Sequence, residues 1–161
     1  MCSQGIAIFN EDKIKGSVIF HQCKGDKSSN VIFDLYGMEP NKERAIHVHT
    51  YGDMSNGCKS LGGHWNPTGQ THGTIHEKGM PRHAGDLINN FKTDSRGRFK
   101  FSYRDDMIKV SGSNSIIGRS VVIHDGVDDL GLGGNEESLI TGNAGARFAC
   151  AVIGLANKDS F

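Results

Sequence analysis

Two histidines separated by one residue are the feature of this sequence that most directly suggests chemistry. In His47-Val48-His49 the two imidazoles stand at positions i and i+2. On a strand such residues face the same side with Cα atoms about 6.5–7 Å apart, so both rings can reach one metal ion. The alternative is two polar residues on a solvated face, but the apolar neighbours Ile46 and Val48 do not favour such a face.

More metal donors follow along the chain. They are His64, His72, His76, His83, Asp86 and His124. Three histidines with one carboxylate make an ordinary zinc set, whereas an all-imidazole set suits copper. Spacing alone therefore predicts one or two histidine-rich metal sites, and leaves open a hydrolytic zinc enzyme or a redox copper protein. His21, far upstream, is expected to be a surface residue.

The elements that must position these donors are predicted to be strands. Short β-branched, aromatic or alternating runs occur at 14–20, 31–36, 45–49, 121–123 and 148–155, and residues 91–103 indicate a hairpin around a turn at 94–97. About eight strands separated by turn signals favour an antiparallel sandwich or barrel. Two Gly- and Asn-rich stretches, about 50–85 and 125–146, are too long for tight turns and are expected to be functional loops.

Composition limits the class of protein. The 161 residues carry 18 basic and 18 acidic side chains, which argues against nucleic-acid binding and a polybasic membrane anchor. The length predicts one domain, residues 1–161. No apolar run reaches the roughly 20 residues that span a bilayer, and the first residues lack signal-peptide features. We therefore expect a soluble, cytoplasmic chain.

The four cysteines, at 2, 23, 58 and 150, form no CxxC pair. Zinc ribbons and thioredoxin-like redox motifs are thereby excluded. For an intracellular chain of this length, the residue types alone predict four reduced thiols.

Several longer motifs resemble the copper/zinc superoxide dismutase family. Residues 45–53, AIHVHTYGD, and 142–150, GNAGARFAC, resemble its two signatures. The blocks NEES at 135–138, IIGR at 116–119 and HWNP at 64–67, with Trp where Phe is usual, also match in the right order. The resemblance extends from Gly5 to Asn157. It implies an eight-stranded antiparallel Greek-key barrel, immunoglobulin-like, with a metal-binding loop and an active-site loop.

The resemblance also implies the activity and the role of each site residue. The activity is conversion of superoxide to dioxygen and hydrogen peroxide, with one copper and one zinc ion per subunit. The copper ligands would be His47, His49, His64 and His124. The zinc ligands would be His64, His72, His83 and Asp86. His64 would thus bridge the two metals and accept a proton during the cycle.

Four further roles follow from the same resemblance. Asp128 would link a copper histidine to a zinc histidine, Arg147 would attract superoxide, and Thr141 would narrow the channel. Cys58 and Cys150 would form a disulfide, which replaces the reduced-thiol expectation for that pair. Cys2 and Cys23 have no family partner and are expected to be free thiols.

The sequence departs from the family pattern at two places in its loops. The segment between His72 and His83 is two residues longer than usual and contains His76, which could compete with His72 for zinc. We expect His72 to be the ligand because His72-Gly73 follows the family pattern. No lysine lies between His124 and Arg147, and Ile140 stands where a lysine is common. This predicts slower or less salt-sensitive turnover.

The resemblance predicts a homodimer through Tyr51-Gly52, Ile117-Gly118 and Ile153-Gly154, although burial in the core would explain these residues almost as well. A copper chaperone is a possible partner that would deliver the copper.

Three other functions compete with the dismutase as interpretations of this sequence. A copper chaperone would carry MxCxxC, which is absent, and an inactive decoy would lack a ligand or Arg147, none of which is missing. A zinc hydrolase would need a carboxylate base that the spacing does not identify.

Overall fold

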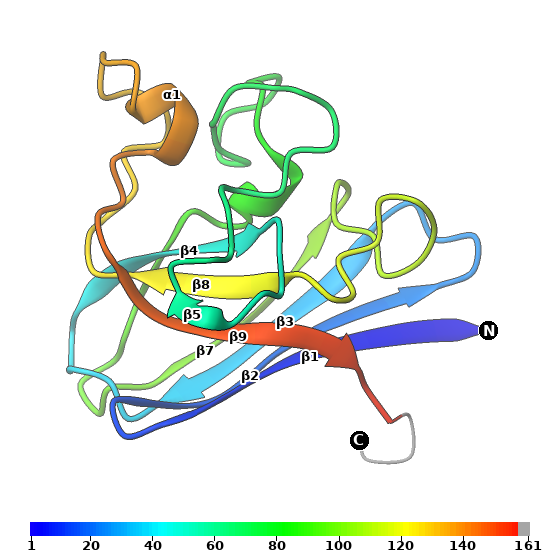
Figure 1. Cartoon of the computed structure of the whole chain (residues 1–161), viewed down its shortest axis with the longest axis horizontal. Helices are drawn as coiled ribbons and strands as arrows, with labels where there is room; N and C mark the ends of the chain where they lie inside the picture. The colour runs from blue at the N-terminus through cyan, green and yellow to red at the C-terminus, as the bar shows by residue number, and fades with distance from the viewer. Residues whose placement is uncertain (158–161) are drawn as a thin grey trace.

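The computed structural model describes residues 1–157 and consists mainly of strands (Figure 1). The strands are β1 (Cys2–Glu11), β2 (Ile14–Cys23), β3 (Ser29–Tyr36), β4 (Glu43–His49), β5 (Ser55–Cys58), β6 (Asn90–Lys92), β7 (Phe99–Asp105), β8 (Ser120–His124) and β9 (Arg147–Leu155). The helices are the short 3-10 helix η1 (Ala84–Asp86) and the single turn α1 (Ser138–Thr141).

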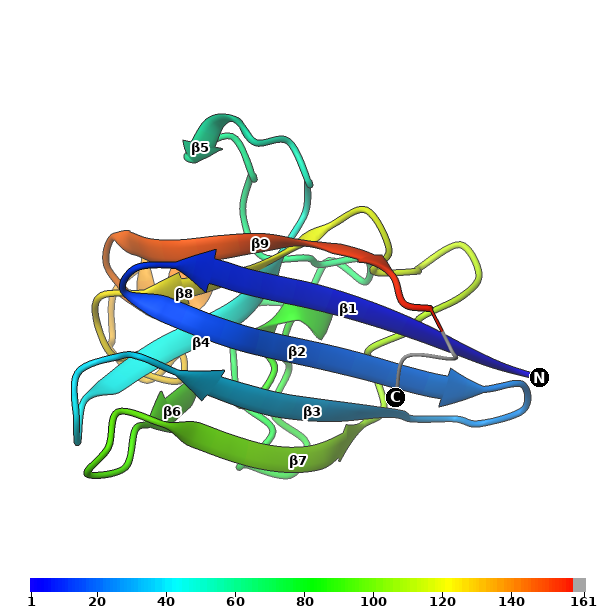
Figure 2. The same ribbon diagram turned by 90° about the horizontal axis from the view of Figure 1, so that it is seen from below.

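Eight strands form one antiparallel sheet in the order β6-β4-β8-β9-β1-β2-β3-β7. The sheet curls into a nearly closed barrel: β1, β2, β3 and β7 lie side by side, with β4 and β8 behind them (Figure 2). The consecutive strands β3 and β4 are not neighbours in the sheet, so the chain crosses from one side of the barrel to the other. The predicted all-β, eight-stranded antiparallel fold is confirmed.

The predicted hairpin over residues 91–103 is wrong. The turn is present, because the Gly97 amide donates to the Asp94 carbonyl and the Asp94 side chain accepts the amides of Arg96 and Arg98. Beyond it the two strands separate, since β6 pairs with β4 and β7 pairs with β3. The turn therefore carries the chain between the two ends of the sheet instead of closing a hairpin.

The prediction that Cys2 and Cys23 are free thiols is also wrong. The structure contains a strand absent from the predicted set, β1, which pairs with β2 in a continuous register from Cys2↔Cys23 to Glu11↔Ile14. The two cysteines are directly opposed, with Cα atoms 3.8 Å apart, and are joined by a disulfide. The residue types alone do not reveal this bond, because the partner of Cys23 is set by the register of β1 on β2.

Alternation along the strands builds the core. In β3 the residues Val31, Phe33 and Leu35 are fully buried, while the intervening side chains are partly exposed. Strands β4 and β8 depart from this pattern, because Arg44–His49 and all of β8 are buried on both faces. Their outer faces must therefore be covered by other parts of the chain.

The cover comes from the two long connections. In Figure 1 the loop before η1 and the segment containing α1 project on the same side of the barrel, beyond β4 and β8. A disulfide between Cys58 and Cys150 ties the first loop to β9, as the resemblance implied. It packs against Leu61 and Val122 in a small separate core. Within residues 1–157, none of the helices has the length and apolar character needed to cross a membrane.

Candidate metal centre

Strand β4 directs its alternate side chains to two different environments. Ile46 and Val48 point into the barrel core, so His47 and His49 lie on the opposite face. Both histidines are nonetheless buried, with at most 2% of their surface exposed, because the loops cover that face. The i, i+2 spacing thus places two imidazoles side by side under a cover, as the sequence predicted.

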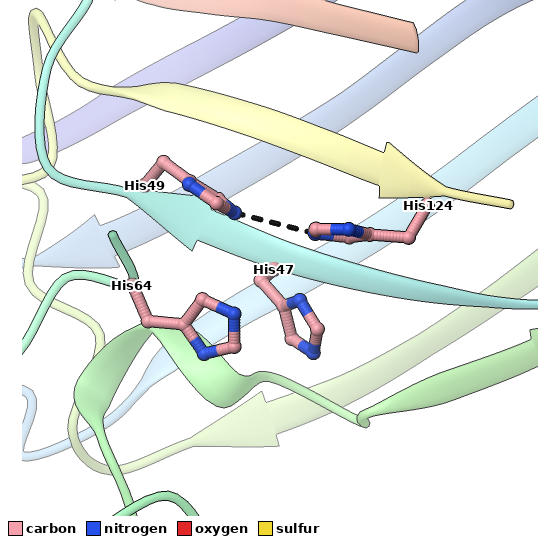
Figure 3. Close-up of side chains that lie close together, drawn as sticks. All are labelled: His47, His49, His64 and His124. Atoms are coloured by element: carbon pink, nitrogen blue, oxygen red, sulfur yellow. Dashed lines mark hydrogen bonds between the residues drawn. The ribbon is translucent and has the colours of Figure 1, made fainter. Parts of the chain in front are cut away.

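Two more histidines complete a cluster with this pair. His124 comes from the end of β8, and His64 comes from the loop, where it forms an isolated bridge with His49 (Figure 3). One ligand nitrogen from each of the four rings lies within 4.8 Å of the others. The Nε2 atoms of His49 and His124 are 3.3 Å apart. Four imidazoles from three segments therefore converge on one point.

The second nitrogen of three of these rings is fixed by a protein acceptor. His49 Nδ1 donates to the Gly62 carbonyl at 2.8 Å, and His124 Nδ1 donates to the Gly145 carbonyl at 3.1 Å. His47 Nε2 lies 2.6 Å from Asp128. By contrast, His47 Nδ1 and His64 Nε2 are buried and have no hydrogen-bond partner. Buried donors and acceptors are normally satisfied, so unpartnered nitrogens facing a cluster fit a metal ion.

A second cluster adjoins the first and shares His64. The Nδ1 atoms of His64, His72 and His83 lie 2.9, 2.9 and 3.1 Å from the same oxygen, Asp86 Oδ1. A tetrahedron with metal–ligand bonds of roughly 2.0 Å has edges of ~3.3 Å, close to these separations. Three imidazoles and one carboxylate oxygen therefore have the composition and spacing of a tetrahedral zinc site.

Local backbone contacts hold Asp86 in place. Its other oxygen, Oδ2, accepts the amides of His83 at 2.8 Å and Gly73 at 3.0 Å. A side chain at Gly85 would collide with the Val48 carbonyl and the Trp65 backbone, so only glycine lets η1 pack so closely on β4. This packing places the η1 carboxylate beside the loop histidines.

Asp128 connects the two clusters. Its Oδ2 lies 2.6 Å from His47 Nε2, and its Oδ1 lies 2.8 Å from His72 Nε2. Asn90 fixes the Asp128 backbone through two hydrogen bonds, and Asn89 donates to Asp128 Oδ2 at 3.1 Å. Neither asparagine can be predicted as part of the site from the sequence, because no spacing signal connects them to residue 128.

Burial and charge set the protonation of the clusters. Burial lowers the pKa of His47 and His49 well below the ordinary histidine value, and it lowers the pKa of His124 to about 4. Burial also acts to raise the pKa of Asp86, but hydrogen bonds from its three histidines hold that pKa well below its usual range. The first set is therefore neutral, with lone pairs available, and the second contains a buried negative charge.

The pKa of His72 shifts in the opposite direction to those of His47, His49 and His124. Burial acts to lower its pKa, but hydrogen bonds with Asp128 and Asp86 outweigh that effect and raise the pKa to about 9. A proton on His72 then supplies the positive charge that the two carboxylates require. The same requirement is met by a cation, so the residues present fit a metal ion in this cluster.

A cavity of about 320 Å³ opens onto the first cluster, lined in part by His49, His64 and His124. Arg147 lines it as well and donates through both terminal nitrogens to the carbonyls of Cys58 and Gly62. Among the described residues that line this cavity, Arg147 is the one Lys or Arg.

The lining of the cavity also includes an acidic and a hydroxyl side chain. Thr141 Oγ1 donates to Glu137 at 2.6 Å, and both residues line the cavity. His76 belongs to neither cluster; its Nε2 lies 3.3 Å from the Ile88 carbonyl. His21 is exposed on β2 and also lies outside both clusters.

An antiparallel β-barrel bearing two adjoining clusters of metal ligands, with one histidine in common, defines a protein built for two metal ions. The family model for copper/zinc superoxide dismutase matches residues 14–153. The chain belongs to the copper/zinc superoxide dismutase family, which confirms the resemblance carried by the motifs.

Relatives of similar length support this assignment. The Cu-Zn superoxide dismutase of Cordyceps militaris is 51% identical over 145 residues, which cover 90% of this chain and 92% of that protein. The corresponding protein of Neurospora crassa is 48% identical over 153 residues, covering 94% and 97%. The crystal structure of the clock protein EA4 superposes with a TM-score of 0.87 at 40% identity, covering 96% and 95%.

Proposed function

We propose that this protein converts superoxide to dioxygen and hydrogen peroxide with one copper and one zinc ion bound per chain. The observation that carries the proposal is the pair of adjoining clusters, which have His64 in common and open onto a cavity that contains Arg147. The names of the relatives and the family membership support the same activity.

We assign the metals from the chemistry of the donors. Copper suits the all-imidazole set, His47, His49, His64 and His124. Zinc suits the tetrahedral set with a carboxylate, His64, His72, His83 and Asp86. His72 is preferred to His76 because its Nδ1 lies 2.9 Å from Asp86 Oδ1, whereas His76 is outside the cluster.

Copper, when bound, would supply the one-electron oxidation and reduction by which two superoxide anions and two protons become dioxygen and hydrogen peroxide. His64 can take part in the proton balance. Its Nδ1 faces the zinc set, and its Nε2 is buried without a protein partner beside the copper set. We therefore assign to His64 Nε2 the holding of one proton, and the second comes from solvent.

Arg147 binds and orients the substrate anion. Its guanidinium is fixed by two carbonyl acceptors at the cavity wall, so its charge needs no reorganisation when an anion arrives. Thr141 and Glu137 line the same cavity, and we assign to them its restriction to small species. Asp128 acts on the rings and not on the substrate, because it fixes the orientation of His47 and His72.

We also propose that the protein assembles as a homodimer. A homodimer is supported by Tyr51, which is 58% exposed, and by open space beyond Gly154 on β9. Ile153 is fully buried in the core and so does not contribute a free surface. Delivery of copper by a chaperone, a cytoplasmic location and a single domain over residues 1–161 stay predictions; residues 158–161 lie outside the described part of the chain.

Two ligand substitutions test the metal assignment and the activity together. We expect His49→Gln to lose copper and superoxide turnover while it keeps zinc, because His49 belongs to the first cluster alone. His83→Gln should lose zinc and keep copper. Metal content by atomic emission and superoxide decay by ultraviolet absorbance provide the readouts. Full turnover by a His49→Gln variant that holds no copper would overturn the proposed function.

A further inference from the structure

A third group of metal donors lies at the open end of the β1–β2 hairpin. It consists of Cys2, His21 and Cys23, whose ligand atoms all lie within 4.8 Å of one another. None of these residues belongs to the histidine clusters of the metal centre. The group therefore needs its own explanation.

The strand register creates this group. Cys2 is paired directly with Cys23, and His21 lies two residues before Cys23, so the three side chains share one face of the hairpin. The opposite face of β2 carries the buried Phe20 and Gln22. His21 is exposed, and both cysteines are partly exposed. Small molecules and ions in solution can therefore reach all three donors.

The register would keep the donors together after reduction. Nine further residue pairs of the β1–β2 ladder follow Cys2↔Cys23, and the Lys24 amide donates to the Met1 carbonyl at 2.9 Å just beyond it. His21 Nε2 lies 3.5 Å from Cys23 Sγ. Two sulfurs and one imidazole nitrogen would thus remain close to one point without the disulfide.

We propose that reduction of the Cys2–Cys23 disulfide by a small thiol creates a surface site for Cu(I), with Cys2, Cys23 and His21 as its three ligands. In the reduction, two thiol molecules break the protein S–S bond, two protein S–H groups form, and the two thiols leave as a new disulfide. Cu(I) then binds to the thiolates and the imidazole as the thiol protons are released.

The donor set favours Cu(I) over zinc. Thiolates are soft ligands that select Cu(I), and three donors satisfy its coordination. Structural zinc sites almost always use four protein ligands, and the described residues supply only three at this position. In the oxidised protein the thiolates are absent, so binding depends on the redox state of the pair.

A copper competition experiment tests the site on the holoprotein with its copper and zinc already bound. The protein is reduced with an excess of the small thiol 2-mercaptoethanol, freed of reductant, and titrated without oxygen with the Cu(I) complex of bicinchoninate. We expect wild-type protein to take one Cu(I) per chain more than the C2S/C23S variant. Reoxidised wild-type protein should take no more than that variant, and a thiol count reports the state of the pair.

Single substitutions assign the ligands. We expect His21→Gln to weaken the extra site by about 10–100-fold or more, since loss of even an outer partner of a metal site costs that much. His76→Gln, which alters a histidine outside every cluster, should leave the extra site unchanged. Equal Cu(I) uptake by reduced wild-type and C2S/C23S proteins would overturn the proposal. So would unchanged affinity in His21→Gln, or uptake of Zn²⁺ in place of Cu(I).

Discussion

At the scale of single residues, Arg147 carries the positive charge that lines the cavity. Replacement with alanine removes this charge without touching a metal ligand. We expect Arg147→Ala to lower kcat/KM for superoxide by about 10-fold or more at low salt, because the cavity loses the positive charge that attracts the anion. Metal content should stay the same, and Arg147→Lys should recover part of the rate. Unchanged turnover in Arg147→Ala would contradict the role assigned to this residue.

A substitution at Ile140 would add a positive charge near the cavity instead of removing one. It is half exposed on α1, and the neighbouring Glu137 places negative charge at the cavity. We expect Ile140→Lys to raise the rate by about 2–10-fold at low ionic strength, because an added cation attracts the anion. The gain should shrink near 0.15 M salt, where the screening length is about 8 Å. Ile140→Gln is the matched neutral control, and an equal gain in both variants would exclude an electrostatic cause.

Individual residues were predictable only where local geometry decides their position. The i, i+2 rule placed His47 and His49 together without any family information. Allocation of His72, His83 and Asp86 to one cluster came from the resemblance, because these residues converge through an irregular loop. The disulfide between Cys2 and Cys23 was missed, because it follows from a pairing of β1 with β2. A cysteine in isolation gives no signal of its cross-strand partner.

At the scale of elements, the turn after α1 is packed against the link between the clusters. Gly142 has φ of 66°, and a Cβ there would lie under 3.0 Å from both Asp128 Oδ1 and His72 Nε2. We expect Gly142→Ala to disturb this link and weaken zinc binding by about 10–100-fold, measured by competition with a chelator.

Gly134→Ala is the matched control for this substitution. Gly134 has φ of 74° in the same connection, and a Cβ there meets no atom within 4 Å. The Gly134→Ala variant therefore measures the effect of backbone strain without a collision. Equal loss of zinc affinity in the two variants would show that strain, and not the contact with Asp128, causes the effect.

The elements themselves were predicted better than their pairing. Alternation and β-branched residues indicated most strands, since each strand buries one face in the barrel. The sequence of residues 91–103 predicts a hairpin because residues 94–97 do form a turn. A turn signal fixes only the local direction of the chain, and β6 and β7 find their partners at opposite ends of the sheet order. The separation of β6 and β7 is decided by long-range strand pairing, which no local sequence pattern indicates.

At the scale of the whole molecule, assembly can be tested at the surface of β9. We expect wild-type protein to sediment as a dimer, at twice the 17.4 kDa mass of one chain. Gly154→Arg should shift it toward the monomer, because a large charged side chain would enter the proposed interface. The fold should tolerate this change, since a Cβ at Gly154 meets no atom within 4 Å. Ser95→Arg, in an exposed turn, is the control, and dimers in all three proteins would place the interface elsewhere.

The overall architecture could be expected from the sequence, because eight short strands with two long loops leave few alternatives to an antiparallel barrel. The way the loops close over β4 and β8 could not be predicted from composition or periodicity. It depends on close packing at Gly85, on the Cys58–Cys150 disulfide and on Asp128, which join segments far apart in the chain. These contacts turn a strand pair with buried histidines into a site for two metal ions.

The central claim is that the two clusters together make a superoxide dismutase. The most direct measurement is the decay of superoxide in the presence of catalytic amounts of protein loaded with one copper and one zinc ion per chain, with and without cyanide. If the claim holds, we expect fast decay that cyanide abolishes, because cyanide would compete for a copper ion bound beside the cavity. Full loading with both metals and decay no faster than in protein-free buffer would contradict it.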